Sequence, residues 1–228
     1  RVENADEQPF ANFEAAFAIG EESLDTTTPY APLLVMAFAP SNPKTVYLGT
    51  SGAGLYRSLD EGVTWQAAGF AGQTIEAIAI DPANPSLVWV SSSALGGLKV
   101  TTSGGATWND GGLPNVITYA LKRSPAGTLM AGTSNGVYVR SGTTWTHIGL
   151  AGVSVTSLGV HPAKPQVLLA GTTNGVWMTV NSGVTWLNKP TELRFHVIGE
   201  IHFDWADPAW VYINTRGHGV LRAYFRWP

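Results

Sequence analysis

Short runs of apolar and aromatic residues alternate with turn residues along most of the chain. In a representative unit, an apolar run starts at Leu33, a turn contains Pro40 and Pro43, and a second run covers 45–50. Such short runs between Pro and Gly clusters are typical of strands, and no segment sustains the apolar spacing of an amphipathic helix. The pattern therefore predicts an all-β chain of short strands and tight turns.

The same unit recurs five times. Its marker glycine stands at positions 54, 97, 136, 175 and 219, with steps of 43, 39, 39 and 44 residues, enough for three or four strands each. One small sheet cannot bury both its faces, so stacking the units around an axis is the stable arrangement. We expect a single β-propeller domain with blades at about 33–74, 75–115, 116–152, 153–192 and 193–228.

The fifth unit stops before its outer strand, because no Thr-Trp pair follows Gly219. A spare β-capable stretch, Phe10–Ile19 within the N-terminal segment 9–19, is expected to complete this blade and close the ring. The alternative is that Phe10–Ile19 forms a short helix. The aromatic tail Ala223–Pro228 is expected to be the third strand of the fifth blade, or else a terminus that docks into a partner.

The turn before Trp65 reads Ser58-Leu59-Asp60-Glu61-Gly62-Val63-Thr64-Trp65. It resembles the Asp-box, or BNR repeat, Ser-x-Asp-x-Gly-x-Thr-Trp. The second copy has Ser103 and the fourth has Asn181 in place of the Asp, the third is one residue short, and the fifth has none. Families with this box include sialidases, xyloglucan-degrading glycosidases, sortilin-type sorting receptors and photosystem II assembly factors. The resemblance therefore implies a propeller fold and leaves the function open.

The chemistry of the box is that of a hairpin turn. A short acceptor such as Asp60 can bond nearby backbone N–H groups, and glycine tolerates the positive φ that the turn needs. The tryptophans are expected to pack inward and anchor the outer strand. We therefore assign a structural role to Ser58, Asp60, Gly62, Thr64, Trp65, Gly105, Thr107, Trp108, Trp145, Asn181, Gly183, Thr185 and Trp186.

Charge and composition exclude several functions. The chain of 228 residues has 13 Lys and Arg against 16 Asp and Glu, a net charge of −3, and no basic block, which disfavours nucleic-acid binding. No stretch approaches the roughly 20 apolar residues of a membrane span. Cysteine is absent, so disulfides and thiolate metal sites are excluded, and no metal or cofactor is expected. The chain begins with Arg1, from which we expect an exported protein after signal-peptide removal.

No catalytic motif stands out. The Arg-Ile-Pro motif of sialidases is absent, and carboxylates after residue 81 are limited to Asp110, Glu192, Glu200, Asp204 and Asp207, whereas a glycosidase needs two across one cleft. The main hypothesis is a non-catalytic propeller that acts as an interaction or assembly subunit with protein partners. The alternatives are a glycan-binding module, with platforms at Tyr56, Tyr138 and Trp177 unless these are core residues, and a glycoside hydrolase.

One strand departs from the others. Aligned on its prolines, the first strand of each blade shows two columns of small or apolar residues, which a crowded axis favours: Val35/Ala37, Ala77/Ala79, Thr118/Ala120 and Ser157/Gly159. The fifth blade has Glu200 and His202 there, and Asp204 continues the alternation on the same face. These residues are expected either to line a tunnel mouth and bind a ligand, or to pair with each other, Arg216 or His218 and fill the channel.

Overall fold

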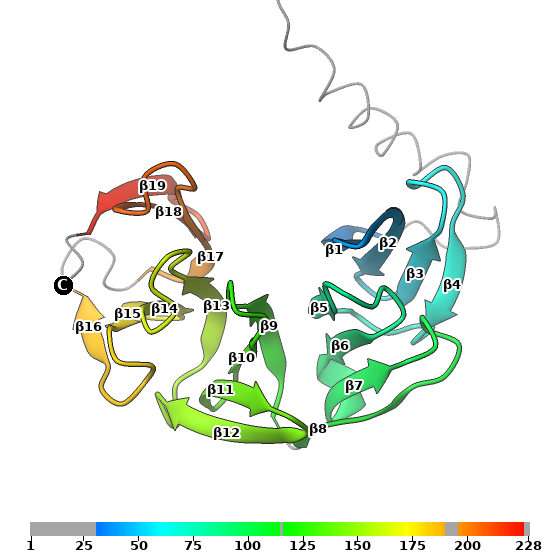
Figure 1. The fold of residues 1–228 in the computed structure, drawn as a ribbon, viewed down its shortest axis with the longest axis horizontal. Helices are drawn as coiled ribbons and strands as arrows, with labels where there is room; N and C mark the ends of the chain where they lie inside the picture. The colour runs from blue at the N-terminus through cyan, green and yellow to red at the C-terminus, as the bar shows by residue number, and fades with distance from the viewer. Residues whose placement is uncertain (1–30, 115, 190–195, 226–228) are drawn as a thin grey trace, which may run out of the picture. The chain divides into compact units, whose positions relative to one another are not determined.

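The protein is a five-bladed β-propeller (Figure 1), here a computed structural model that describes residues 31–114, 116–189 and 196–225. The expected all-β class is confirmed, because the only helix in these ranges is a three-residue 3₁₀ turn at Ser93–Leu95. Five small antiparallel sheets follow one another along the chain, coloured from blue for β1 to red for β19.

The sheets have these strand bounds. The first contains β1 (Leu33–Ala39), β2 (Asn42–Thr50), β3 (Leu55–Ser58) and β4 (Gln66–Gly69). The second contains β5 (Ala77–Ile80), β6 (Val88–Ser92), β7 (Gly97–Thr101) and β8 (Asn109–Pro114). The third contains β9 (Thr118–Arg123), β10 (Leu129–Thr133), β11 (Gly136–Ser141) and β12 (Thr144–Gly149). The fourth contains β13 (Val155–Val160), β14 (Leu168–Thr172), β15 (Gly175–Thr179) and β16 (Leu187–Lys189), and the fifth β17 (Ile198–Phe203), β18 (Trp210–Thr215) and β19 (Gly219–Tyr224).

Each sheet is a meander in which consecutive strands pair. Four sheets have four strands, while the fifth has three in the described ranges, as the missing Thr-Trp predicts. The start of the tail forms the last part of β19, where Tyr224 pairs with Trp210. The segment Phe10–Ile19, which we expected to supply a fourth strand, lies outside the described residues.

The chain divides into two compact units, residues 1–90 with 100–109, and residues 91–99 with 110–228. In the first unit, Tyr47 and Leu55 of the first sheet pack with Ile78 and Ile80 of β5. In the second, the third to fifth sheets pack face to face, and β13 lies beside both β9 and β17. Burial of β-branched and aliphatic side chains between sheets provides the main stabilisation in both units.

Glycines in the middle strands allow close sheet packing. A Cβ added to Gly171 of β14 would clash with Ser157 Oγ and lie 2.5 Å from a methyl carbon of Ile198 in the next sheet. Gly49 of β2 would meet Val35 and Ile75 in the same way. These glycines serve the packing between sheets.

The cross-strand register corrects one sequence alignment. Ala120 pairs with Gly132 and Lys122 with Met130, just as Ser157 pairs with Gly171 and Gly159 with Leu169. The two residues of the third sheet that correspond to Ser157 and Gly159 are therefore Ala120 and Lys122, and not Thr118 and Ala120. The proline alignment failed because the connection after β9 covers only residues 124–128, whereas the one after β13 covers 161–167.

The small members of this column lie between neighbouring sheets instead of lining a channel. A Cβ on Gly159 would lie 2.8 Å from a methyl carbon of Ile201 and 3.1 Å from the ring of Phe203 in the fifth sheet. Ala120 belongs to the core between the third and fourth sheets, and Val35 and Ala37 pack against the core of the first unit. Small side chains are required here because the next sheet contributes the larger ones.

Candidate functional site

Glu200 and His202 form a direct pair on the exposed face of β17. The distance between His202 Nε2 and Glu200 Oε2 is 2.5 Å, so this nitrogen donates to the carboxylate, and both side chains are about 60% exposed. The hydrogen bond from His202 lowers the pKa of Glu200, burial acts in the opposite direction, and the charge of Lys122 lowers it further. The expected pairing of Glu200 with His202 is therefore present.

Asp204 does not join this pair. Its Oδ1 accepts hydrogen bonds from the backbone N–H groups of Ala206 and Asp207 at 2.9 and 3.2 Å, and its Oδ2 accepts one from the Tyr212 hydroxyl at 3.4 Å. The two backbone bonds lower the pKa of Asp204. Asp204 therefore stabilises its own turn.

A shallow groove of about 220 Å³ extends over the ends of the first strands β9, β13 and β17. Lys122 and Arg123 line one side, His202 and Trp205 line the other, and apolar residues of β13 and β17 form the floor. Trp205 is 92% exposed. Arg123 donates to the carbonyl oxygen of Gly127. Neither Lys122 nor Trp205 was predicted from the sequence, because the alignment on prolines placed Lys122 outside the column and no motif contains Trp205.

The outward face of the fifth sheet differs from the corresponding face of the fourth sheet, which packs against the fifth. Across the strands of the fourth sheet, Gly159, Leu169 and Met178 form one row, and all three are buried. The matching row of the fifth sheet, by register, is His202, Tyr212 and Arg222, and all three are exposed.

Aromatic contacts order this outward face. The Arg222 guanidinium carbon lies 3.8 Å from the centre of the Trp210 ring and 5.6 Å from that of Tyr212. Trp210 and Tyr224 meet edge to face, with ring centres 5.0 Å apart. The fifth sheet thus presents a cation held on aromatic rings where the fourth presents a hydrocarbon surface.

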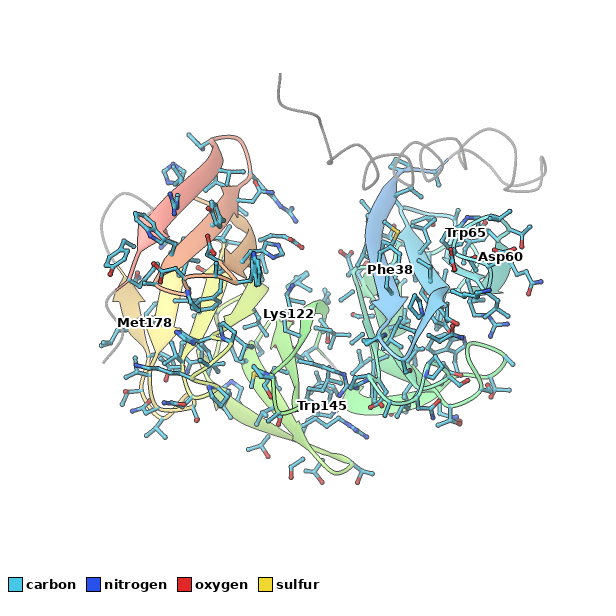
Figure 2. All side chains as sticks on the ribbon, turned by 45° about the horizontal axis from the view of Figure 1, so that its top comes forward. Phe38, Asp60, Trp65, Lys122, Trp145 and Met178 are labelled. Atoms are coloured by element: carbon cyan, nitrogen blue, oxygen red, sulfur yellow. The ribbon has the colours of Figure 1, made fainter. Side chains whose placement is uncertain are left out.

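The Asp-box-like turns are closed networks of hydrogen bonds. Asp60 accepts from the backbone N–H and hydroxyl of Thr64, at 2.9 and 2.6 Å, and from the hydroxyl of Ser58 at 2.7 Å. The bonds from Thr64, with that from Ser58, lower the pKa of Asp60 to about 2. Figure 2 labels Asp60 and Trp65 near each other on the first sheet.

The degenerate copies keep much of this network. Asn181 accepts from the Thr185 N–H and from the Thr179 hydroxyl, both at 2.9 Å, and its amide donates to the Thr185 hydroxyl. In the second copy, Ser103 accepts from the N–H of Thr107 at 3.0 Å. The predicted positive φ is present at all three glycines, with values of 94°, 99° and 89° at Gly62, Gly105 and Gly183.

The tryptophans differ in what they join. Trp65 donates its indole N–H to Gly62 within its own turn, at 3.0 Å. The other three donate at 2.9 Å to a carbonyl oxygen in the outer strand of the preceding sheet, in the pairs Trp108–Ala68, Trp145–Gly111 and Trp186–Ile148. These three contacts link successive sheets, which the repeat alone did not indicate.

The suggested sugar platforms lie in different surroundings. Tyr56 is buried, Trp177 packs against the core between the third and fourth sheets, and Tyr138 lies against the ring of His147. Within the described ranges, no group of three or more His, Asp or Glu side chains is placed to hold a metal ion. No helix in that part of the chain has the length and apolar character needed to span a bilayer.

No family model matches this chain. Over 105 residues it is 30% identical to the probable oligoxyloglucan-reducing end-specific xyloglucanase of Neosartorya fischeri, a match that covers 43% of this chain and 12% of that protein. The chain thus spans about an eighth of the length of this relative.

Solved structures show the same fold. A GH74 enzyme of Niastella koreensis superposes with a TM-score of 0.71 at 23% identity, over 82% of this chain and 35% of that chain. YCF48 from Cyanidioschyzon merolae gives 0.53 at 13% identity, over 86% and 83%. A structure of YCF48 bound to D1 peptide gives 0.52 at 15% identity, over 89% and 83%. At these identities the likeness establishes the propeller fold alone.

Proposed function

We propose that this protein is a non-catalytic propeller that binds another protein, as an interaction or assembly subunit. The observation that carries the proposal is the outward face of the fifth sheet, where Trp210, Tyr212, Arg222 and Tyr224 stand together. Tyr, Trp and Arg are the residue types enriched at the energetic centres of protein interfaces.

The first sheet contains a template for such a contact. Tyr47 and Arg57 occupy the same register positions as Tyr212 and Arg222. Arg57 donates to the carbonyl oxygen of Gly104, in a turn of the neighbouring sheet, at 2.5 Å. A Tyr-Arg pair at this position thus recognises a backbone carbonyl on a facing protein surface, and Arg222 is exposed and oriented by its rings for the same role.

The structure of YCF48 bound to D1 peptide shows that a propeller of similar fold binds a polypeptide segment. Carboxylate placement also favours binding over hydrolysis. Glycosidases need two carboxyl groups about 5 to 9.5 Å apart, whereas Glu200 and Asp204 are four residues apart in an extended chain, which separates their backbones by roughly 13 Å. Asp204 is also occupied by its turn.

A charge reversal tests this function. Arg222→Glu removes the exposed cation without disturbing the buried face of the sheet, and Arg216→Glu makes the same change in an exposed turn of the same blade. We expect affinity capture followed by native mass spectrometry to recover a stoichiometric protein complex with the unchanged protein and with Arg216→Glu, and to lose it with Arg222→Glu. A complex that survives Arg222→Glu, or no complex with the unchanged protein, contradicts the proposal.

A glycan-binding role is the second candidate, with a glycoside hydrolase as its catalytic variant. The partial similarity to a xyloglucanase and the exposed indole of Trp205 favour it, because sugar rings stack on exposed aromatic side chains. Affinity electrophoresis in xyloglucan, together with an assay for released reducing ends, tests both versions. Retardation that Trp205→Ala abolishes would support glycan binding, and sugar release that Glu200→Gln abolishes would support hydrolysis.

A further inference from the structure

We infer that the groove over β9, β13 and β17 binds a partner segment in which an acidic residue stands next to an aromatic one. The inference rests on the proposed function, since it names the chemistry of a protein ligand. It concerns a surface of the second unit, with Lys122, His202, Phe203 and Trp205 as its main elements.

Lys122 supplies a cation in the groove that an acidic ligand can engage. Its side chain is half-buried, and within the described ranges its ammonium group makes no hydrogen bond. The nearby negative charge is that of Glu200, which His202 already engages. A carboxylate placed in the groove can accept a charge-assisted hydrogen bond from Lys122. Figure 2 labels Lys122 on β9.

The floor of the groove selects an apolar neighbour. Val160, Pro162 and Phe203 contribute accessible carbon surface, while Leu158 and Ile201 of the lining are themselves buried. A volume of about 220 Å³ is smaller than the roughly 300 Å³ at which small-molecule sites begin. The groove therefore fits one large side chain of a longer ligand, and the exposed indole of Trp205 gives an aromatic ring a surface for stacking.

The same surface offers a neutral sugar few side-chain acceptors for its hydroxyl groups. No Asn, Gln, Asp, Glu, Ser or Thr lines the groove among the described residues. Of its cations, Arg123 is engaged with the carbonyl of Gly127. An acidic-aromatic peptide satisfies both the ammonium of Lys122 and the carbon floor.

The test is a double-mutant cycle with defined peptides. The probes are the acetylated, amidated hexapeptides Gly-Gly-Phe-Asp-Gly-Gly and Gly-Gly-Asp-Phe-Gly-Gly, each with Asp→Asn and Phe→Ala counterparts, titrated against the full chain by NMR chemical-shift changes. We expect Lys122→Met to weaken binding of an Asp peptide about tenfold. The Asn peptide should bind the unchanged protein about tenfold more weakly than the Asp peptide does, and Lys122→Met should not weaken binding of the Asn peptide further. Trp205→Ala should likewise weaken binding of a Phe peptide, and it should not weaken binding of the Phe→Ala peptide further.

A substitution of opposite sign and a matched control complete the design. Glu200→Gln removes the competing negative charge, so it should strengthen binding of the Asp peptides several-fold. Lys44→Met makes the same change as Lys122→Met on the first sheet and should leave binding unchanged. Additive losses in the cycle, weaker binding in Glu200→Gln, or a groove that binds a xyloglucan oligosaccharide but neither peptide, would overturn the inference. A partner complex that persists in Lys122→Met would reject this groove and leave the proposed function standing, whereas the absence of any complex would reject the function itself.

Discussion

His161 holds a turn in a way that makes stability depend on pH. Its Nδ1 accepts hydrogen bonds from the backbone N–H groups of Ala163 and Lys164, both at 3.1 Å. Asp81 and Asp204 do the same in the corresponding turns of the second and fifth sheets. A neutral imidazole nitrogen can accept these bonds and a protonated one cannot. The turn of the fourth sheet therefore requires neutral His161.

The surroundings of His161 act in the same direction. The residue is 4% exposed and lies against the ring of Phe203. Burial lowers the pKa of His161, and the charge of Lys164 lowers it further. His161 therefore takes up a proton at a lower pH in the folded protein than in the unfolded chain, where its pKa is near 6.5. The stabilisation by His161 is complete above that pH and is lost as the pH falls towards the lower pKa of the folded state.

The magnitude follows from proton linkage. A difference of one bound proton changes the unfolding free energy by at most about 1.36 kcal/mol per pH unit. Between pH 6.5 and 5.0 the loss from His161 is therefore at most about 2 kcal/mol, which is also what two backbone donors without acceptors would cost at roughly 1 kcal/mol each.

Urea unfolding at pH 7.5, 6.5, 5.5 and 5.0 measures this loss, with His161→Asn as the comparison. Asparagine keeps an acceptor for the two N–H groups and does not titrate. Because the variant also loses the contact with Phe203, the pH slopes are compared and not the absolute stabilities. His218→Asn, at an exposed turn position, controls for histidine replacement in general. Parallel pH profiles for the unchanged protein and His161→Asn would refute the reasoning.

Three further outcomes are expected. Asp60→Asn should melt within a few degrees of the unchanged protein, because asparagine makes the same turn bonds in the fourth sheet, whereas Asp60→Ala should lower Tm clearly in differential scanning calorimetry. Trp186→Phe should lower the urea unfolding free energy by about 1 kcal/mol for the lost bond between sheets, and more than Trp65→Phe, whose bond stays within one turn. Gly171→Ala should cost about 1–3 kcal/mol by overpacking, while Gly199→Ala, with its nearest neighbour at 3.5 Å, should be close to neutral by the same assay. Equal effects within any of these pairs would contradict the corresponding packing argument.

The sequence alone determined the fold class and the blade count. The five marker glycines, the short β-rich runs and the missing Thr-Trp after Gly219 report local conformation and strand order, which repeat in every unit. The chemistry of the Asp-box-like turns was equally local, so the acceptor role of Asp60 and the positive φ of Gly62 could be predicted from the residues themselves.

Only the tertiary structure decided which residues of different blades meet. The interaction of Lys122 with Glu200 was not predicted, because the connection after β9 is two residues shorter than the one after β13 and the alignment on prolines ignored that difference. The link from Trp186 to Ile148 and the closeness of Gly159 to Ile201 likewise depend on how the sheets stack. Contacts between sheets depend on side-chain volume and on the register of segments that are distant in the sequence, so no motif within one blade indicates them. The groove that Trp205 lines could therefore be identified only from the folded structure.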